Sequence, residues 1–129
     1  MEIDLKRLRL LLEELDVTSY STPIIVEGRK DAESLRKIGI TGLIHSISGR
    51  SISEVVEELK AYREVIILTD YDSEGFKIKN KLVKDFQTAG VKVNLRYYKL
   101  LKSVLKGFII QIEGLFKFLS SKGYWDEST

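Results

Sequence analysis

The chain has 129 residues, of which 43% are hydrophobic and 31% charged, and it contains no cysteine. This length predicts one domain, 1–129, with one core. The lack of cysteine excludes disulfides, thiolate catalysis and cysteine-ligated metal sites, and the single His45, inside a predicted strand, argues against a histidine site. Because no apolar run reaches the ~20 residues of a membrane span and no signal peptide is evident, we expect a cytoplasmic protein without a membrane partner.

The net charge of +2 is unevenly distributed along the chain. Residues 1–76 hold ten basic and fifteen acidic residues, whereas residues 77–129 hold eleven basic and four acidic ones. Between Lys77 and Lys106 there are nine basic residues and a single acid, Asp85. This asymmetry predicts a polyanionic partner, with a solvated basic face as the alternative.

The predicted elements alternate between helices and strands. Helices are expected at 2–15, 30–38, from Ser51 or Ser53 to Leu59 or Tyr62, at 73–88 and at 103–120. Short apolar strands are expected at 23–28, 42–47, 65–69 and 91–98. Regular alternation predicts a three-layer, Rossmann-like α/β fold, with helices on both faces of a four-stranded parallel sheet of the common order 2-1-3-4.

The last predicted helix, 103–120, carries an apolar stripe along one side. Ile110 and Phe118 fall outside this stripe. We expect them to meet further core, with a homodimer through this helix as the alternative.

Two predicted strands end in acidic residues: the first in Glu27, the third in Asp70 and Asp72. In a sheet of order 2-1-3-4 these strands are neighbours at the switch point, where functional groups collect beyond the carboxyl ends. Alternation places Asp70 and Asp72 on the same side of an extended backbone. The three acids are therefore expected to converge, and a hard divalent cation such as Mg²⁺ or Mn²⁺ offsets their repulsion best.

Three other interpretations compete for the segment DYDSEG. An N-cap at Asp72, with Glu74 complementing the helix dipole, leaves the other acids unexplained. An EF-hand calcium loop requires a Glu where Lys81 stands, and a helix before the loop. Phosphatases with an aspartyl nucleophile place D-x-D on the first strand of a larger domain, whereas here it follows the third predicted strand.

Two motifs carry a family resemblance. V-E-G-R-K-D at 26–31, followed by T-D-Y-D-S-E-G at 69–75, resembles the Toprim domain. That domain is shared by topoisomerases, bacterial-type primases, OLD-type nucleases and the ribonuclease that matures 5S ribosomal RNA. The resemblance covers about residues 22–100, and the entire chain resembles the small stand-alone Toprim proteins of archaea.

The resemblance implies a magnesium-dependent protein that acts on nucleic acid. By position, Glu27 would be the general acid/base or a metal-linked residue, Asp70 and Asp72 would hold the metal, and Glu74 would assist through water. The implied activity is that of a nuclease that hydrolyses phosphodiester bonds, with RNA favoured over DNA by analogy. A non-catalytic adaptor that binds nucleic acid or an RNA-processing complex is the alternative.

Several basic residues are candidates for phosphate contacts. They follow the first or second strand, or share one face of the helix at 73–88: Arg29, Lys30, Arg50, Lys77, Lys81 and Lys84. A solubilising surface is the alternative for the last three. Lys79 falls within an apolar arc of the same helix and is expected to snorkel or, alternatively, to turn towards the acids.

Overall fold

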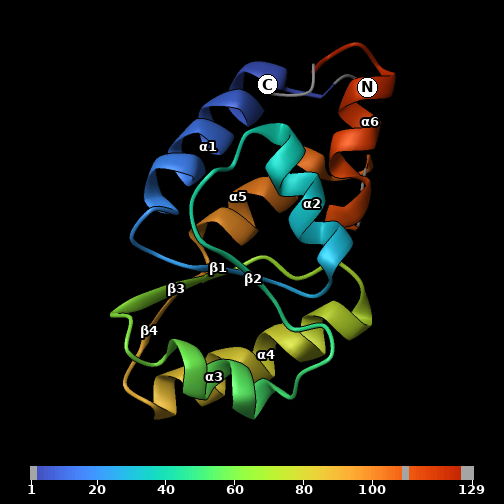
Figure 1. The fold of residues 1–129 in the computed structure, drawn as a ribbon. Coiled ribbons are helices and arrows are strands. Elements are labelled where there is room, and N and C mark those ends of the chain that lie inside the picture. The colour runs from blue at the N-terminus through green and yellow to red at the C-terminus, as the bar shows by residue number, and fades with distance from the viewer. Residues whose placement is uncertain (1–2, 109–110, 126–129) are drawn as a thin grey trace.

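A computed structural model of the chain describes residues 3–108 and 111–125. These residues form three layers, with a sheet between two layers of helices (Figure 1). The strands are β1 (Ile24–Val26), β2 (Ile44–Ser46), β3 (Glu64–Ile67) and β4 (Lys92–Asn94). All pairs are parallel and the order is β2-β1-β3-β4, which confirms the predicted fold class. Each strand is shorter than predicted.

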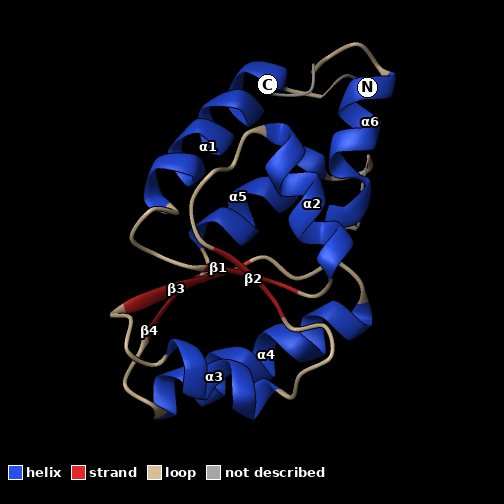
Figure 2. Cartoon of the chain, in the orientation of Figure 1, coloured by secondary structure: helices blue, strands red, loops and turns tan. Residues whose placement is uncertain are grey.

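Helices cover both faces of the sheet (Figure 2). One layer contains α1 (Leu5–Thr18), α2 (Arg29–Ile38), α5 (Arg96–Leu105) and α6 (Leu115–Ser121), which follows the 3₁₀ turn η1 (Ile112–Gly114). The other layer contains α3 (Ile52–Leu59) and α4 (Ser73–Thr88). Within the described part of the chain, no helix is long and apolar enough to cross a membrane.

The sheet supplies side chains to two separate cores. Ile24 and Val26 of β1 pack in the cluster that contains α1, α2 and α5. Ile25, between them, packs in the opposite cluster with α3 and with Phe86 of α4. Because side chains alternate along a strand, a sheet covered on both faces must be apolar at consecutive positions. This explains why the β1 sequence is an unbroken apolar run.

The C-terminal third departs from the sequence prediction. Asn94 ends β4, and its Oδ1 accepts a hydrogen bond from the backbone N–H of Arg96 at 2.9 Å. Helix α5 therefore begins inside the segment predicted as a strand, 91–98. It ends at Leu105, and Gly107 then adopts a left-handed φ of 83°. The single helix predicted at 103–120 is wrong, because this glycine terminates α5 before η1 and α6 form.

The apolar stripe of that predicted helix is divided among α5, η1 and α6. Five of its members pack in the core that also contains β1, and each of these is at most 6% exposed: Val104, Leu105, Ile112, Leu115 and Leu119. Phe118 is half-buried, and its ring centroid lies 5.9 Å from that of Phe108. Phe118 therefore packs against the chain's own core, as expected, and a homodimer through this segment stays a prediction. The prediction for Ile110 falls outside the described residues.

The turn from β3 into α4 requires a glycine. A Cβ added to Gly75 would lie 2.1 Å from the carbonyl oxygen of Asp70 and 2.8 Å from its carbonyl carbon. Both atoms belong to the backbone, so no side-chain rotation relieves the clash. Gly75 therefore fixes how closely the first turn of α4 approaches the end of β3.

We expect Gly75→Ala to lower the free energy of unfolding by about 1–3 kcal/mol, the typical cost of forcing extra atoms into packed structure. Because the added Cβ would lie 2.1 Å from a backbone atom, we expect a cost at the upper end of this range, above the ~1 kcal/mol that alanine gains over glycine in a helix. Gly28→Ala is the matched control, because its Cβ would meet only Asp31 Oδ2, at an ordinary 3.5 Å. Urea unfolding of both variants measures the difference. Equal stability of Gly75→Ala and wild type would refute the close approach.

His45 of β2 is packed rather than free in solvent. Its Nδ1 lies 3.5 Å from Oε1 of Glu58, and its side chain is 24% exposed. Burial, and then the charges of Arg50 and Arg36, lower the pKa of His45 from its ordinary value of 6.5. The same Glu58 carboxylate also pairs with Arg50.

An NMR titration of His45 should therefore give a midpoint below 6.5. With a lowered pKa in the folded state, the unfolded chain binds more protons between the two pKa values. Stability should consequently fall as the pH drops through about 6.5. In His45→Gln this part of the pH dependence should disappear. A midpoint at or above 6.5 would contradict the burial argument.

Candidate functional site

The carboxyl ends of β1 and β3 bring Glu27 and Asp70 together. The two strands are parallel neighbours, with Ile25 paired to Ile67. Oε2 of Glu27 accepts a hydrogen bond from the backbone N–H of Asp70 at 2.6 Å, across 43 residues of sequence. This is the convergence expected at a switch point, and it depends on the observed strand order.

Asp70 is a partly buried acid held by the C-terminal segment. Its Oδ1 accepts a hydrogen bond from the backbone N–H of Ile112 in η1 at 2.8 Å. Burial raises the pKa of Asp70 to about 7, and the charges of Asp31, Glu27 and Asp72 act in the same direction. The Ile112 N–H opposes this rise but does not cancel it. Asp70 is therefore an ionisable group whose charged form is disfavoured near neutral pH.

Glu27 also has a raised pKa. Burial is the largest cause, the hydrogen bond from Asp70 N–H opposes it, and the charges of Asp72, Asp31 and Glu74 add to it. The acids at this edge of the sheet thus lie within electrostatic range of one another. A cluster of this kind marks a functional-site candidate, because without a counter-charge it costs free energy.

Asp72 is the N-cap of α4. Its Oδ1 accepts a hydrogen bond from the backbone N–H of Gly75 at 2.7 Å, so the helix-cap interpretation holds for this residue. The cap uses one carboxylate oxygen. Glu74 is exposed in the first turn of α4, where a negative charge complements the helix dipole.

Asp31 is a buried acid to which the sequence analysis assigned no role. It is 6% exposed, and its Oδ2 accepts a hydrogen bond from the backbone N–H of Gly28 at 2.8 Å. Burial raises its pKa, while the backbone N–H groups of Gly28 and Glu113 act to lower it. The available signal was its position three residues after a glycine N-cap, where an acid closes a capping box.

The donor chemistry of the site suits a hard divalent cation. Asp70 and Asp72 supply carboxylate oxygens, and the hydroxyl of Thr69 is buried without a hydrogen-bond partner among the described residues. No three acidic or histidine side chains in residues 3–108 and 111–125 form a ready-made metal cage. Magnesium binding commonly uses one or two carboxylates together with water and substrate phosphates. Asp70 and Asp72 fit that mode. A metal site that also includes Glu27 and Glu74 stays a prediction.

The basic candidates from the sequence are dispersed over the molecule. Lys30 Nζ lies 3.9 Å from Oε1 of Glu113. Arg50 pairs with Glu58 and donates to the carbonyl oxygen of Ser46 at 2.9 Å. Lys81 Nζ lies 2.9 Å from Oδ2 of Asp85. Exposed positions also hold Arg29, Lys77 and Lys84. A phosphate contact by Arg50 or Lys81 would thus compete with an existing ion pair.

Lys79 is the basic residue whose position is most informative. Its Nζ lies 4.3 Å from the ring centroid of Phe76 and 4.9 Å from that of Tyr98 on α5. The side chain therefore bridges α4 and α5.

Tyr71, which separates the two aspartates, donates its hydroxyl to the Tyr98 carbonyl oxygen at 3.0 Å, so it does not face the metal candidates.

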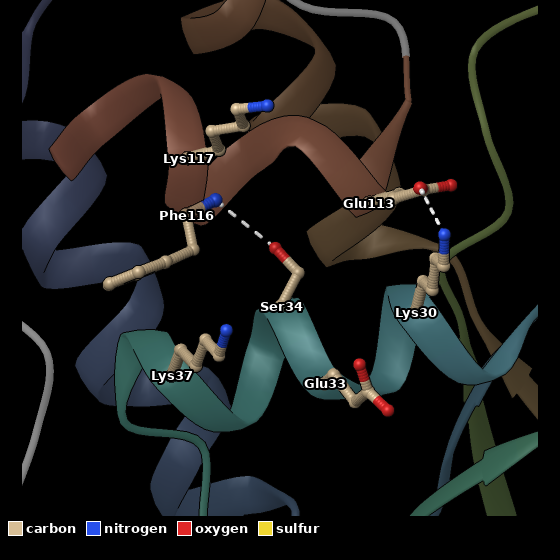
Figure 3. Close-up of a pocket in the computed structure, with 7 residues that line it drawn as sticks. All are labelled: Lys30, Glu33, Ser34, Lys37, Glu113, Phe116 and Lys117. Carbon is tan, nitrogen blue, oxygen red and sulfur yellow. Dashed lines mark hydrogen bonds and ion pairs between the residues drawn. The ribbon is translucent and has the colours of Figure 1, made fainter. Parts of the chain in front are cut away.

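A cavity of about 190 Å³ lies between α2 and the C-terminal segment (Figure 3). It is lined by Lys30, Glu33, Ser34, Lys37, Glu113, Phe116 and Lys117. Inside it, Ser34 Oγ accepts a hydrogen bond from the backbone N–H of Phe116 at 3.1 Å. None of the predicted metal-binding acids lines this cavity, so it is separate from the cluster around Asp70.

Comparisons with known proteins agree with this geometry. Residues 21–95 match the model of the Toprim domain. The chain is 34% identical to a UPF0292 protein of Methanocaldococcus jannaschii over 91% of this chain and 93% of that protein. It is 39% identical to a UPF0292 protein of Pyrococcus abyssi over 75% of this chain and 74% of that protein.

A solved structure shares the fold as well. A putative protein from Aquifex aeolicus superposes with a TM-score of 0.74 at 32% identity, covering 82% of this chain and 95% of the other. Toprim domains in general depend on a metal and act on nucleic acid. On the family model and on these relatives, the chain belongs to the Toprim domain family.

Proposed function

We propose that this protein is a metal-dependent phosphodiesterase that cleaves nucleic acid at the Glu27–Asp70 edge of the sheet. The observation that carries the proposal is the 2.6 Å hydrogen bond that holds the Glu27 carboxylate against the Asp70 backbone. It keeps a proton-transfer group beside the strongest metal-binding candidates. RNA is the favoured substrate, on family analogy alone.

Glu27 is suited to proton transfer. Its pKa is raised from the ordinary carboxyl value, which is the direction of neutrality, where a general acid/base works best. Only its Oε2 is engaged by the Asp70 N–H. The other oxygen is available to take a proton from an attacking water or give one to a leaving oxygen.

Asp70 and Asp72 would hold the metal, with Glu74 assisting through water. When bound, Mg²⁺ or Mn²⁺ would offset charge on the phosphate and orient it. Gly75 N–H fixes one oxygen of Asp72 and Ile112 N–H fixes one oxygen of Asp70. Both carboxylates are thereby oriented before any ligand arrives. Arg29 and Lys30, at the N-terminus of α2, would meet phosphates of the bound strand.

The proposal is tested by cleavage of a panel of RNA and DNA substrates with Mg²⁺ or Mn²⁺. Glu27→Gln should lower the rate by about 10²–10⁴-fold, the usual contribution of general acid–base catalysis. Asp70→Asn should lower it through weakened metal binding. Glu33→Gln, at an exposed position of α2, is the control and should cleave as wild type does. If wild type and both site variants behave alike on every substrate, the enzyme assignment fails.

Metal binding should also change how Asp70→Asn affects the stability of the fold. In EDTA at pH 8, Asp70→Asn should raise the free energy of unfolding by about 1–2 kcal/mol, because it removes a charge that burial and neighbouring acids disfavour. The gain is smaller than the full pKa shift implies, since water reaches part of the group. In saturating Mg²⁺, wild type should gain stability by binding the ion, and the variant should gain less.

Asp85→Asn is the control for this experiment. Asp85 forms an exposed ion pair with Lys81 on α4, so its neutralisation should not stabilise the fold in EDTA. Urea unfolding with and without Mg²⁺ measures all three proteins. An equal Mg²⁺ response in wild type and Asp70→Asn would argue against a metal at this residue.

A second candidate function is a non-catalytic module that binds nucleic acid or an RNA-processing complex. One observation favours it: Asp70 and Asp72 each already accept a hydrogen bond from a backbone N–H. Those bonds give both carboxylates a structural role without any metal. A wild-type protein that binds nucleic acid and cleaves none of the panel would support this candidate over the nuclease.

A further inference from the structure

Three lysines from two helices gather beside the carboxylate site. Lys79 extends from α4 to the Tyr98 ring, and Lys99 and Lys102 follow Tyr98 on α5. The charges of Lys102 and Lys99 lower the pKa of Lys79, although burial is the larger cause. Like charges that act on one another in this way repel, so their arrangement favours an anionic ligand.

Four lysines of the described surface are held in ion pairs, Lys30 among them. Lys60, Lys81 and Lys92 each form an ion pair with a neighbouring acid. Among the described residues, Lys79, Lys99 and Lys102 form none. A ligand phosphate would therefore meet their charges without displacing a carboxylate.

An exposed aromatic ring stands next to the lysines. Phe76, in the first turn of α4, is 51% exposed. The Lys79 ammonium group lies over its ring at 4.3 Å from the centroid. A nucleobase can stack on such an exposed ring whatever the identity of the base.

The surface continues into a hollow beyond the end of β4. This hollow has a volume of about 520 Å³ and is lined by Val93, Leu95, Arg96, Lys99 and Leu100. Lys99 therefore belongs to the lysine cluster and also lines this hollow beside the apolar residues Val93, Leu95 and Leu100. Alternation of cationic and apolar contacts is the pattern of grooves that track one strand of nucleic acid.

The acids of the proposed active site adjoin this surface. Phe76 follows Gly75, whose N–H is held by Asp72. The charges of Asp72 and Glu27 both act on Tyr98, which forms the floor beneath Lys79. A strand bound over Phe76 would thus have its backbone close to the carboxylates.

We propose that Phe76, Lys79, Lys99 and Lys102, hereafter the α4–α5 surface, bind one strand of nucleic acid beside the carboxylate site. One base stacks on Phe76, and the adjacent phosphates meet the three lysines. The ligand is single-stranded, because in a duplex the base faces are covered by their neighbours and cannot reach the ring. The inference rests on the proposed function for the choice of nucleic acid as the ligand.

The α4–α5 surface competes with the row Lys77, Lys81 and Lys84 that the sequence suggested. Both sets contain three lysines and start on α4, so replacing either set by glutamine removes the same charge. Lys81 of the row is already paired with Asp85 at 2.9 Å. Comparison of the two triple variants therefore separates a located binding surface from a general effect of net charge.

The test is fluorescence anisotropy with a labelled 12-nucleotide oligouridine and its duplex with oligoadenosine, in EDTA, over a range of salt. Lys79→Gln/Lys99→Gln/Lys102→Gln should weaken single-strand binding at least tenfold. It should also reduce the slope of log affinity against log salt by about 2, as expected for three lost phosphate contacts. Lys77→Gln/Lys81→Gln/Lys84→Gln should change the affinity less than threefold.

Phe76→Ala should weaken binding about tenfold with the salt slope unchanged, since it removes stacking rather than charge. Phe76→Trp should restore or exceed wild-type affinity. Circular dichroism and urea unfolding establish that each variant is folded. Equal weakening by the two lysine triples, no effect of Phe76→Ala, tighter binding of the duplex, or no binding by wild type would each overturn the inference.

The binding experiment distinguishes failure of this surface from failure of the proposed nuclease function. Binding in EDTA does not require hydrolysis, so a protein that cleaves nothing can still show the expected pattern at the α4–α5 surface. Conversely, a nuclease whose activity depends on Glu27 but whose binding ignores Phe76 and the three lysines would retain the proposed function and refute this surface.

Discussion

The hydrogen bond from Asp70 N–H to Glu27 depends on the pairing of β1 with β3. These strands are central in the sheet, and their side chains are buried on both faces. A register shift of one residue would exchange the side chains between the two cores and move Glu27 away from Asp70. The packing of successive side chains into the two cores thus also fixes the distance between the two acids.

The acids at this edge oppose stability, and the chain compensates with backbone N–H groups. Gly28, Asp70, Gly75 and Ile112 each donate to a carboxylate. Hydrogen bonds to charged groups contribute about 1.5–3 kcal/mol each, comparable to the cost of partly burying a charge. The compensation is incomplete, because the pKa values of Glu27, Asp31 and Asp70 stay raised. Burial is the largest cause of these raised pKa values and repulsion between the acids adds to it, and a divalent cation would offset both.

Predictions from the sequence were correct where the fold depends on local patterns or on the common strand order. Apolar runs and helix caps located the sheet, and the common strand order brought Glu27 to Asp70. The C-terminal region failed because Asn94 and Gly107 change the chain direction inside segments whose apolar pattern is continuous. Hydrophobic periodicity reports which residues are buried but not where a helix ends. The hydrogen bond of Asp31 with Gly28 is local, but its burial depends partly on Glu113, 82 positions away in the sequence, which the local pattern does not reveal.

Lys79 illustrates the limit of reasoning from one helix at a time. On α4 alone it lies in the apolar arc, which predicts a snorkelling side chain. In the fold, α5 begins at Arg96, two residues before the end of the predicted strand, and this places Tyr98 beneath the ammonium group. The basic tract from Lys77 to Lys106 therefore folds into two surfaces rather than one. The surface that adjoins the acids is formed where Lys79 of α4 contacts Tyr98 of α5. The charge pattern of the sequence alone could therefore suggest a polyanionic partner, but not where on the molecule it would bind.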